Sequence, residues 1–135
     1  MEKFLKQFKL TPMQRVMFES FIFRMADRNI AGYMGGNWES KEIAPGVLIL
    51  LIPGKDDEQV TMNVEISGNV VTTDRVTASA AFTSLVANWF WHMVHGQASM
   101  ESNMAFEQQY HGLRNAVYDD TTHNINTDDY YTLTD

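Results

Sequence analysis

Hydrophobic and polar residues recur at helical spacing over residues 12–28. Thr11 can cap a helix N-terminus, Pro12 fits the first turn, and Gln14 stands where a capping box places it. The pattern therefore predicts a helix that begins directly after Thr11. The preceding residues 3–10 are short and amphipathic, which is typical of a helical turn or of an arm docked on the core.

Two further stretches, residues 79–95 and 99–118, show the same periodicity and predict two more helices. Trp89, Phe90 and Trp91 follow one another in the first of these, and three consecutive positions cannot share one helix face. Two hypotheses explain these three consecutive aromatic residues. The helix is enclosed between the sheet and a neighbouring helix, or it presents an exposed aromatic anchor to a protein partner.

The region between the first two long helices has strand patterns separated by Pro-Gly turns. Its short loops favour an antiparallel meander. Val47–Ile52 is rich in β-branched and leucine residues, which indicates a strand buried on both faces. The predicted strands cover residues 38–43, 47–52, 60–66 and, as a strand or an extended lead into the next helix, 70–75. The predicted fold class is α+β, with an antiparallel sheet of three or four strands packed against about three helices.

The length of 135 residues suits one domain, and the absence of cysteine excludes disulfides and thiolate sites. The formal charge of −7 is unevenly placed. Residues 1–55 hold eight Lys/Arg against five Asp/Glu, and residues 56–135 hold two against twelve. An acidic chain is a poor direct ligand for DNA, whereas an acidic face suits a basic protein partner. Without a membrane-length apolar run or a signal-peptide pattern, we expect a cytoplasmic protein with no membrane contact.

The C-terminal residues 119–135 differ from the rest of the chain. They contain five Asp and two adjacent Tyr, without Lys or Arg, and they show no helical period. We therefore expect a single domain over residues 1–118, followed by an acidic and irregular tail.

Motifs that carry chemistry are few. His92 and His95 lie three apart on a predicted helix, and Glu107 and His111 on the next helix are possible further zinc ligands. A small metal-dependent enzyme is therefore one hypothesis. However, the chain has no Gly-x-Ser-x-Gly turn and no phosphate-binding loop, and its paired acids lie in predicted turns or in the tail. We expect no enzyme activity, no catalytic residues, and no cofactor or metal.

Two motifs carry a family resemblance. The first combines glycines with two aromatic residues: Gly32, Tyr33, Gly35, Gly36 and Trp38. The second is a Tyr-x-x-Leu-Arg pattern on the last predicted helix: Tyr110, Leu113 and Arg114. With the order of the elements over residues 18–118, these motifs resemble the antirestriction proteins of the ArdB/KlcA type. The first motif lacks the context of a phosphate loop, and we expect it to form a structural corner between the first helix and the first strand.

The resemblance implies a small α/β protein of a plasmid, phage or other mobile element that evades host defence. Such proteins relieve restriction by type I restriction–modification enzymes in the host cytoplasm, are not enzymes, and carry no known cofactor. The leading hypothesis is inhibition of a host type I restriction–modification enzyme, or a related defence protein, by protein contact without direct nucleic-acid binding. The second hypothesis is a partial DNA mimic that occupies a basic DNA-binding groove of a defence nuclease.

The charge distribution, and not the resemblance, suggests which residues contact the partner. Acidic side chains concentrate in one predicted turn and in the tail, where two tyrosines adjoin them. The predicted contact residues are Asp56, Asp57, Glu58, Asp119, Asp120, Asp128, Asp129, Tyr130 and Tyr131.

Overall fold

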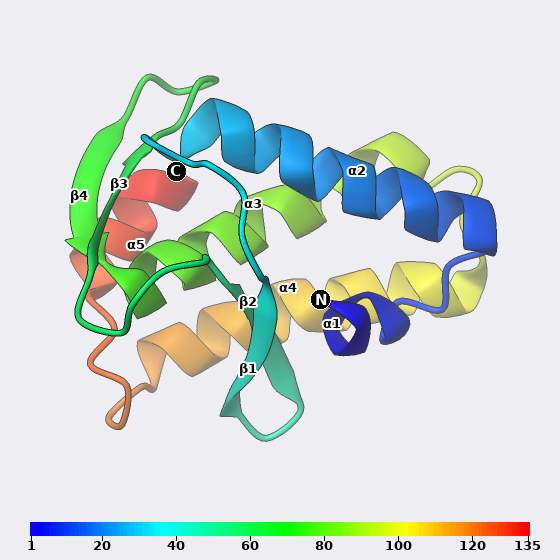
Figure 1. The fold of residues 1–135 in the computed structure, drawn as a ribbon. Helices are drawn as coiled ribbons and strands as arrows, with labels where there is room; N and C mark the ends of the chain where they lie inside the picture. Colours follow the sequence, from blue (N-terminus) through cyan, green and yellow to red (C-terminus); the bar gives the residue numbers. More distant parts are fainter.

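The computed structural model describes residues 1–135 and contains five helices and four strands (Figure 1). In chain order these are α1 (Glu2–Lys6), α2 (Pro12–Asn29), β1 (Glu39–Ala44), β2 (Val47–Leu51), β3 (Gln59–Asn63), β4 (Val70–Asp74), α3 (Arg75–Val94), α4 (Met100–Tyr118) and α5 (Thr127–Thr134). The predicted α+β class is confirmed. The three long helices match the predicted ones, the short helix α1 agrees with the helical turn expected over residues 3–10, and α5 is additional.

Side-chain caps fix where the long helices begin. The Thr11 hydroxyl accepts a hydrogen bond from the Gln14 backbone NH, and the Gln14 side chain accepts one from the Thr11 backbone NH, so the predicted capping box is present. Helix α3 begins at Arg75, earlier than predicted, because Asp74 caps it. The Asp74 carboxylate accepts a bond of 3.0 Å from the Thr77 backbone NH.

Helix α3 is the central element of the fold, and α2 and α4 run along different sides of it (Figure 1). It also contacts α5 and strands β2, β3 and β4, so most of its surface is enclosed, whereas its side near Trp89 and Met93 is open. Phe90 is fully buried, and the Trp91 indole donates a bond of 2.8 Å to the Asn103 side chain on α4. Trp89 and Trp91 are both half-buried, so Phe90 alone of the three lies fully in the core.

The four strands form two separate antiparallel hairpins, β1–β2 and β3–β4. A single sheet of three or four strands is therefore not what the chain forms. The second edge of β3 meets the chain after α2, where Ile30 bridges Met62 and the Ala31 NH donates to the Thr61 carbonyl at 2.9 Å. With that edge occupied, β3 does not pair with β2.

The second edge of β2 is closed by side chains from two helices. The Leu50 NH donates to the Thr83 hydroxyl and the Ile52 NH donates to the Ser79 hydroxyl, both at 2.9 Å. The Gln109 side chain donates to the Leu48 carbonyl at 3.0 Å. Buried backbone polar groups need such partners, and these bonds replace a neighbouring strand. Strand β2 is buried along its middle, as predicted.

The core between α1, α2, α3 and α4 consists largely of phenylalanine rings. Phe18 stacks on Phe90 with ring centroids 4.4 Å apart, and Phe8 stacks on Phe106 at 4.3 Å. Phe4 lies edge-on to Phe8. Offset and edge-to-face pairs of this kind stabilise a core beyond the area that they bury. The N-terminal segment is therefore an integral part of the core.

The C-terminal segment is more ordered than expected. Residues 127–134, predicted to be irregular, form α5, with Asn126 as the N-cap. The helix contacts α3 and β4, and it buries Tyr130 and Leu133, while Ile125 is buried just before it. The weak helical pattern hid these contacts because only two positions of so short a helix face the core. None of the helices in the structure combines the length and apolarity that crossing a membrane requires.

Candidate functional site

The glycine–aromatic motif forms a corner between α2 and β1, as expected. The Trp38 indole is buried and donates a bond of 2.9 Å to the Tyr33 hydroxyl. The same indole stacks on Phe82 of α3, with ring centroids 5.4 Å apart. Gly36 has φ +128°, and a Cβ there would lie 2.7 Å from the Pro53 Cβ. These contacts give the motif a structural role.

Two further glycines shape the same corner. Gly32 and Gly35 have φ values of +71° and +84°, and no atom lies within 4 Å of where a Cβ would stand. Their conformation, and not crowding, therefore favours glycine at both positions.

The Tyr-x-x-Leu-Arg motif of α4 has one residue in the core and the others at the surface. Leu113 is buried, whereas the Arg114 guanidinium is exposed and donates a bond of 2.9 Å to the Tyr110 hydroxyl. Arg114 also lies over the rings of Tyr110 and Tyr131, 5.6 and 5.9 Å from their centroids. The bond with Tyr110 raises the pKa of Arg114. The arginine is therefore held in place by tyrosines and not by carboxylates.

The predicted acidic contact residues lie in two segments, each of which contacts the N-terminal end of α3 at one point. In the first, the exposed Asp56 forms a salt bridge of 2.9 Å with the buried Arg75 at the start of α3. In the second, the Asn126 NH donates to the Thr77 hydroxyl at 2.9 Å, which fixes the start of α5 beside the first turn of α3. Segments far apart in the sequence thus meet at one end of the molecule.

The acids of these segments differ in what they contact. Asp57, Asp119 and Asp128 are exposed, and Asp129 is half-buried in the first turn of α5. Glu58 accepts a bond of 2.8 Å from the Lys55 backbone NH. The side chains that remain free for a partner are therefore fewer than the predicted set.

Asp120 stabilises its own loop. Its carboxylate accepts backbone hydrogen bonds from Ile125 at 2.9 Å, His123 at 3.0 Å and Thr122 at 3.3 Å. Partial burial acts to raise the pKa of Asp120, but these bonds outweigh it and the pKa falls below its usual value. Asp120 is therefore a structural residue of the loop between α4 and α5.

The two tyrosines of the predicted contact set have different roles. Tyr131 is half-buried beside Arg114. Tyr130 is only 1% exposed, and burial raises the pKa of its phenol. The prediction that Tyr130 contacts a partner from the surface does not agree with this burial, because its ring belongs to the core under α5. The sequence put both tyrosines in an irregular tail and so could not separate them.

The histidines do not assemble a metal site. His92 and His95 are exposed near the C-terminal end of α3, and the His95 ring nitrogen Nδ1 lies 3.0 Å from the His92 carbonyl oxygen. No group of three or more His, Cys, Asp or Glu side chains in the structure is arranged to hold a metal ion. The third and fourth ligands that the zinc hypothesis requires are therefore not brought to this pair.

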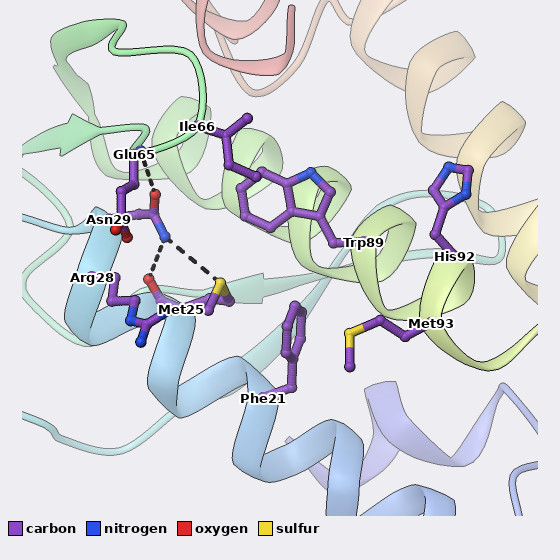
Figure 2. Close-up of a pocket in the computed structure, with 9 residues that line it drawn as sticks. All are labelled: Phe21, Met25, Arg28, Asn29, Glu65, Ile66, Trp89, His92 and Met93. Carbon is purple, nitrogen blue, oxygen red and sulfur yellow. Dashed lines mark hydrogen bonds between the residues drawn. The ribbon is translucent and has the colours of Figure 1, made fainter.

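An apolar groove of about 730 Å³ lies between α2 and α3, and the sequence did not indicate it (Figure 2). Five of its nine lining residues are hydrophobic. They are Phe21 and Met25 of α2, Trp89 and Met93 of α3, and Ile66 of the turn after β3. In Figure 2, Phe21, Trp89 and Met93 converge from the two helices.

Polar residues stand at the edges of this groove. Arg28 and Glu65 lie at one edge, and His92 lies at the other (Figure 2). The buried Asn29 side chain accepts a bond of 2.9 Å from the Glu65 backbone NH and donates one of 2.9 Å to the Met25 carbonyl. The bond from Glu65 joins the end of α2 to the β3–β4 turn, so these two sides of the groove are fixed relative to each other.

The groove was missed because its residues read as parts of core-facing helix stripes. Phe21 and Trp89 do belong to such stripes, but the two helices leave the outer side of this contact uncovered. The sequence predicts that Ile66 ends the strand over residues 60–66, yet it lies beyond β3 and is among the most exposed hydrophobic residues of the chain. The one sign in the sequence that Ile66 could be exposed is its position directly before the Ser67-Gly68 turn.

An apolar groove rimmed by isolated charges suits protein or ligand binding and offers no arrangement for acid–base or nucleophilic chemistry.

Comparison of the sequence with protein-family models and with curated proteins finds no match to either.

Proposed function

We propose that this protein is an antirestriction protein of a phage, plasmid or other mobile element, acting in the cytoplasm of the bacterial host. It inhibits a host type I restriction–modification enzyme, or a related defence protein, by protein contact and without catalysis. The glycine–aromatic corner and the Tyr-x-x-Leu-Arg helix support this proposal because they are the residues that resemble the ArdB/KlcA type.

The groove between α2 and α3 is the observation that supports protein contact. Met93 is 53% exposed and Ile66 is 79% exposed, and both border the half-buried Trp89. Aromatic and methionine side chains grouped in a hollow, with charges only at the rim, are the usual composition of a binding hot spot. We therefore assign the groove as the anchoring surface for the inhibited enzyme.

The acidic segments at the N-terminal end of α3 supply the second part of the proposed contact. Restriction enzymes bind DNA through basic surfaces. Exposed acids attract such surfaces and accelerate association, over a distance that shortens as the salt concentration rises. Asp57, Asp119 and Asp128 of these segments are exposed, and no salt bridge of the structure involves them. In this proposal the acids orient the approach and the groove provides the short-range contact.

The direct test measures phage plating. A host with an active type I system is transformed with the gene or with an empty vector, and the efficiency of plating of unmodified phage is compared. The proposal expects a higher efficiency in cells that express the protein, and no effect in a host without the restriction system. Equal restriction in expressing and control cells, with the folded protein present, would refute the function.

The DNA-mimic hypothesis draws on the same acidic end. A mimic replaces phosphates, so its binding weakens steeply with salt and duplex DNA competes with it. The chain has a basic portion as well, since α1 and α2 carry five of its ten Lys and Arg residues. Binding to the restriction enzyme at several salt concentrations, with and without duplex DNA, separates the hypotheses. Salt-tolerant binding that coexists with DNA supports contact through the groove.

A further inference from the structure

A second and much smaller hollow lies where α3, α4 and α5 meet. Its volume is about 80 Å³, and its lining is mainly polar. Ser84 and Asn88 come from α3, Tyr110 and Arg114 from α4, and Tyr130 and Tyr131 from α5. This cavity is separate from the groove between α2 and α3, with which it shares no lining residue.

The Tyr130 hydroxyl is the unusual feature of this cavity. Tyr130 is 1% exposed, and its hydroxyl is buried without a hydrogen-bond partner. The Ser84 side chain is a polar neighbour, but the pair lacks ordinary hydrogen-bond geometry. Buried polar groups in proteins nearly always have a partner, so this hydroxyl, on a residue that lines the cavity, is a donor with unused capacity.

Arg114 contributes a positive charge that no carboxylate of the chain neutralises. The salt bridges of the structure are Arg15–Glu2 and Arg75–Asp56, and neither involves Arg114. Its one hydrogen bond within the protein goes to the Tyr110 hydroxyl, which leaves most of its five N–H donors free. The rings of Tyr110 and Tyr131 keep the guanidinium at the cavity. An arginine fixed by aromatic rings is a common element of anion recognition.

We propose that this cavity is a binding site for a single carboxylate group. The guanidinium of Arg114 supplies a charge-assisted hydrogen bond, and the hydroxyls of Tyr130 and Ser84 supply neutral ones. The cavity has one cation, which balances the single charge of a carboxylate but not the charge of a phosphate, about −1.5 to −2 at pH 7. Its volume admits a carboxylate head group and excludes a nucleotide or a sugar.

The proposal does not depend on the antirestriction function. The carboxylate comes either from a free small acid or from an acidic side chain of a protein, and the chemistry of the cavity is the same for both. A free small acid fits almost entirely within the cavity, whereas a protein that supplies an acidic side chain lies mostly outside it. An acidic peptide makes contacts around the mouth that acetate cannot make.

The test is a titration of the full chain, followed by NMR shifts of backbone amides and of the Arg114 Nε–H. Sodium acetate and sodium phosphate are added at constant ionic strength. Acetate is expected to give saturable shifts in the millimolar range of affinity. An absence of saturable shifts up to about 100 mM acetate overturns the site. Tighter binding of phosphate than of acetate overturns the assignment to a carboxylate.

Variants locate the binding. Tyr130→Phe keeps the ring and removes the hydroxyl, and Arg114→Gln removes the charge. Both are expected to weaken acetate binding, the arginine variant by about tenfold or more. Tyr118→Phe is the control, because Tyr118 is an exposed tyrosine of the same helix α4. Unchanged binding by both variants, with thermal unfolding showing that they are folded, refutes the proposal.

A short peptide with one Glu and blocked ends distinguishes the sources. Binding at least about tenfold tighter than acetate supports an acidic side chain of a protein as the natural ligand. Equal or weaker binding supports a free small acid.

Discussion

The indole nitrogen of Trp38 donates a hydrogen bond of 2.9 Å to the hydroxyl of Tyr33, and this bond closes the corner between α2 and β1. The Trp38 ring then reaches Phe82 on the central helix. One side chain therefore ties three elements together, and the predictions for the corner follow from that.

Replacement of Trp38 should affect stability before it affects activity. Trp38→Ala removes a buried indole, and we expect a loss of about 3–5 kcal/mol in the free energy of unfolding. Tyr33→Phe removes only the hydrogen bond and should cost about 1 kcal/mol. Urea denaturation measures both, with Met34→Ala as a control because Met34 is 96% exposed. A Trp38→Ala protein with full stability but no antirestriction activity would make the corner a binding site.

Substitutions at neighbouring glycines should differ in cost. Gly36→Val combines a positive φ with a collision against Pro53, so we expect a loss of about 2–4 kcal/mol. Gly35→Ala meets only the conformational penalty, about 1–2 kcal/mol. Thermal unfolding of the two variants tests the ranking. Equal costs would show that Pro53 moves aside.

The Thr83 hydroxyl, which closes the edge of β2, should stabilise the fold by accepting a hydrogen bond from the Leu50 NH. Thr83→Val keeps the shape and leaves the buried Leu50 NH unpaired, which is expected to cost about 1–3 kcal/mol. Thr83→Ser keeps the hydroxyl and should cost less than about 1 kcal/mol. Chemical denaturation of the pair isolates the hydrogen bond from the loss of a methyl group. A serine variant as unstable as the valine variant would assign the effect to packing.

Asp120 should make stability depend on pH in a definite direction. Its pKa is lower in the folded protein than the usual value, so the ionised form stabilises the fold at pH values above the unfolded pKa of about 4. That contribution is lost as the pH falls through the folded pKa. Asp120→Asn should therefore be less stable than the parent protein at pH 7, and the difference should shrink toward pH 3. Asp119→Asn, an exposed neighbour, is the control, and a constant difference across this range contradicts the assignment.

The groove is tested by two methionines of equal exposure. Met93 lines the groove and is 53% exposed, whereas Met104 on α4 is 52% exposed and lies outside it. Met93→Glu is expected to reduce affinity for the restriction enzyme by at least about tenfold and to lower phage plating, while Met104→Glu leaves both unchanged. Both variants should unfold at temperatures close to that of the parent, because each replaces a half-exposed residue. Equal loss of binding in the two variants would remove the groove from the contact.

Much of the local structure followed from residues near one another in the sequence. The Thr11 capping box, the two Pro-Gly turns and the long helical stripes each depend on short-range chemistry, and the corresponding elements lie close to their predicted positions. Asp74 was missed as a cap because the strand pattern continues to Arg75. The four strands were recognised, but how they pair depends on contacts between distant residues. Gln109 and Thr83 gave no sign in the sequence that they would occupy the edge of β2.

The candidate sites were less accessible to sequence reasoning for the same reason. The charge imbalance placed acids in two segments, and the docking of α5 brought those segments to one end of the molecule. The groove and the small cavity exist only because three or more elements meet in space. Tyr130 is buried and Tyr131 is not, because only one face of the two-turn helix α5 packs against α3.

The closure of β2 by helix side chains has a consequence for the order of folding. The amides of Leu50 and Ile52 gain their partners only when α3 has docked, since the acceptors belong to Thr83 and Ser79. Hairpin β1–β2 alone cannot protect those two amides from exchange with solvent. In a native-state hydrogen-exchange experiment they should exchange only on global unfolding, together with the centre of α3, and should thereby act as reporters of helix docking and not of strand pairing.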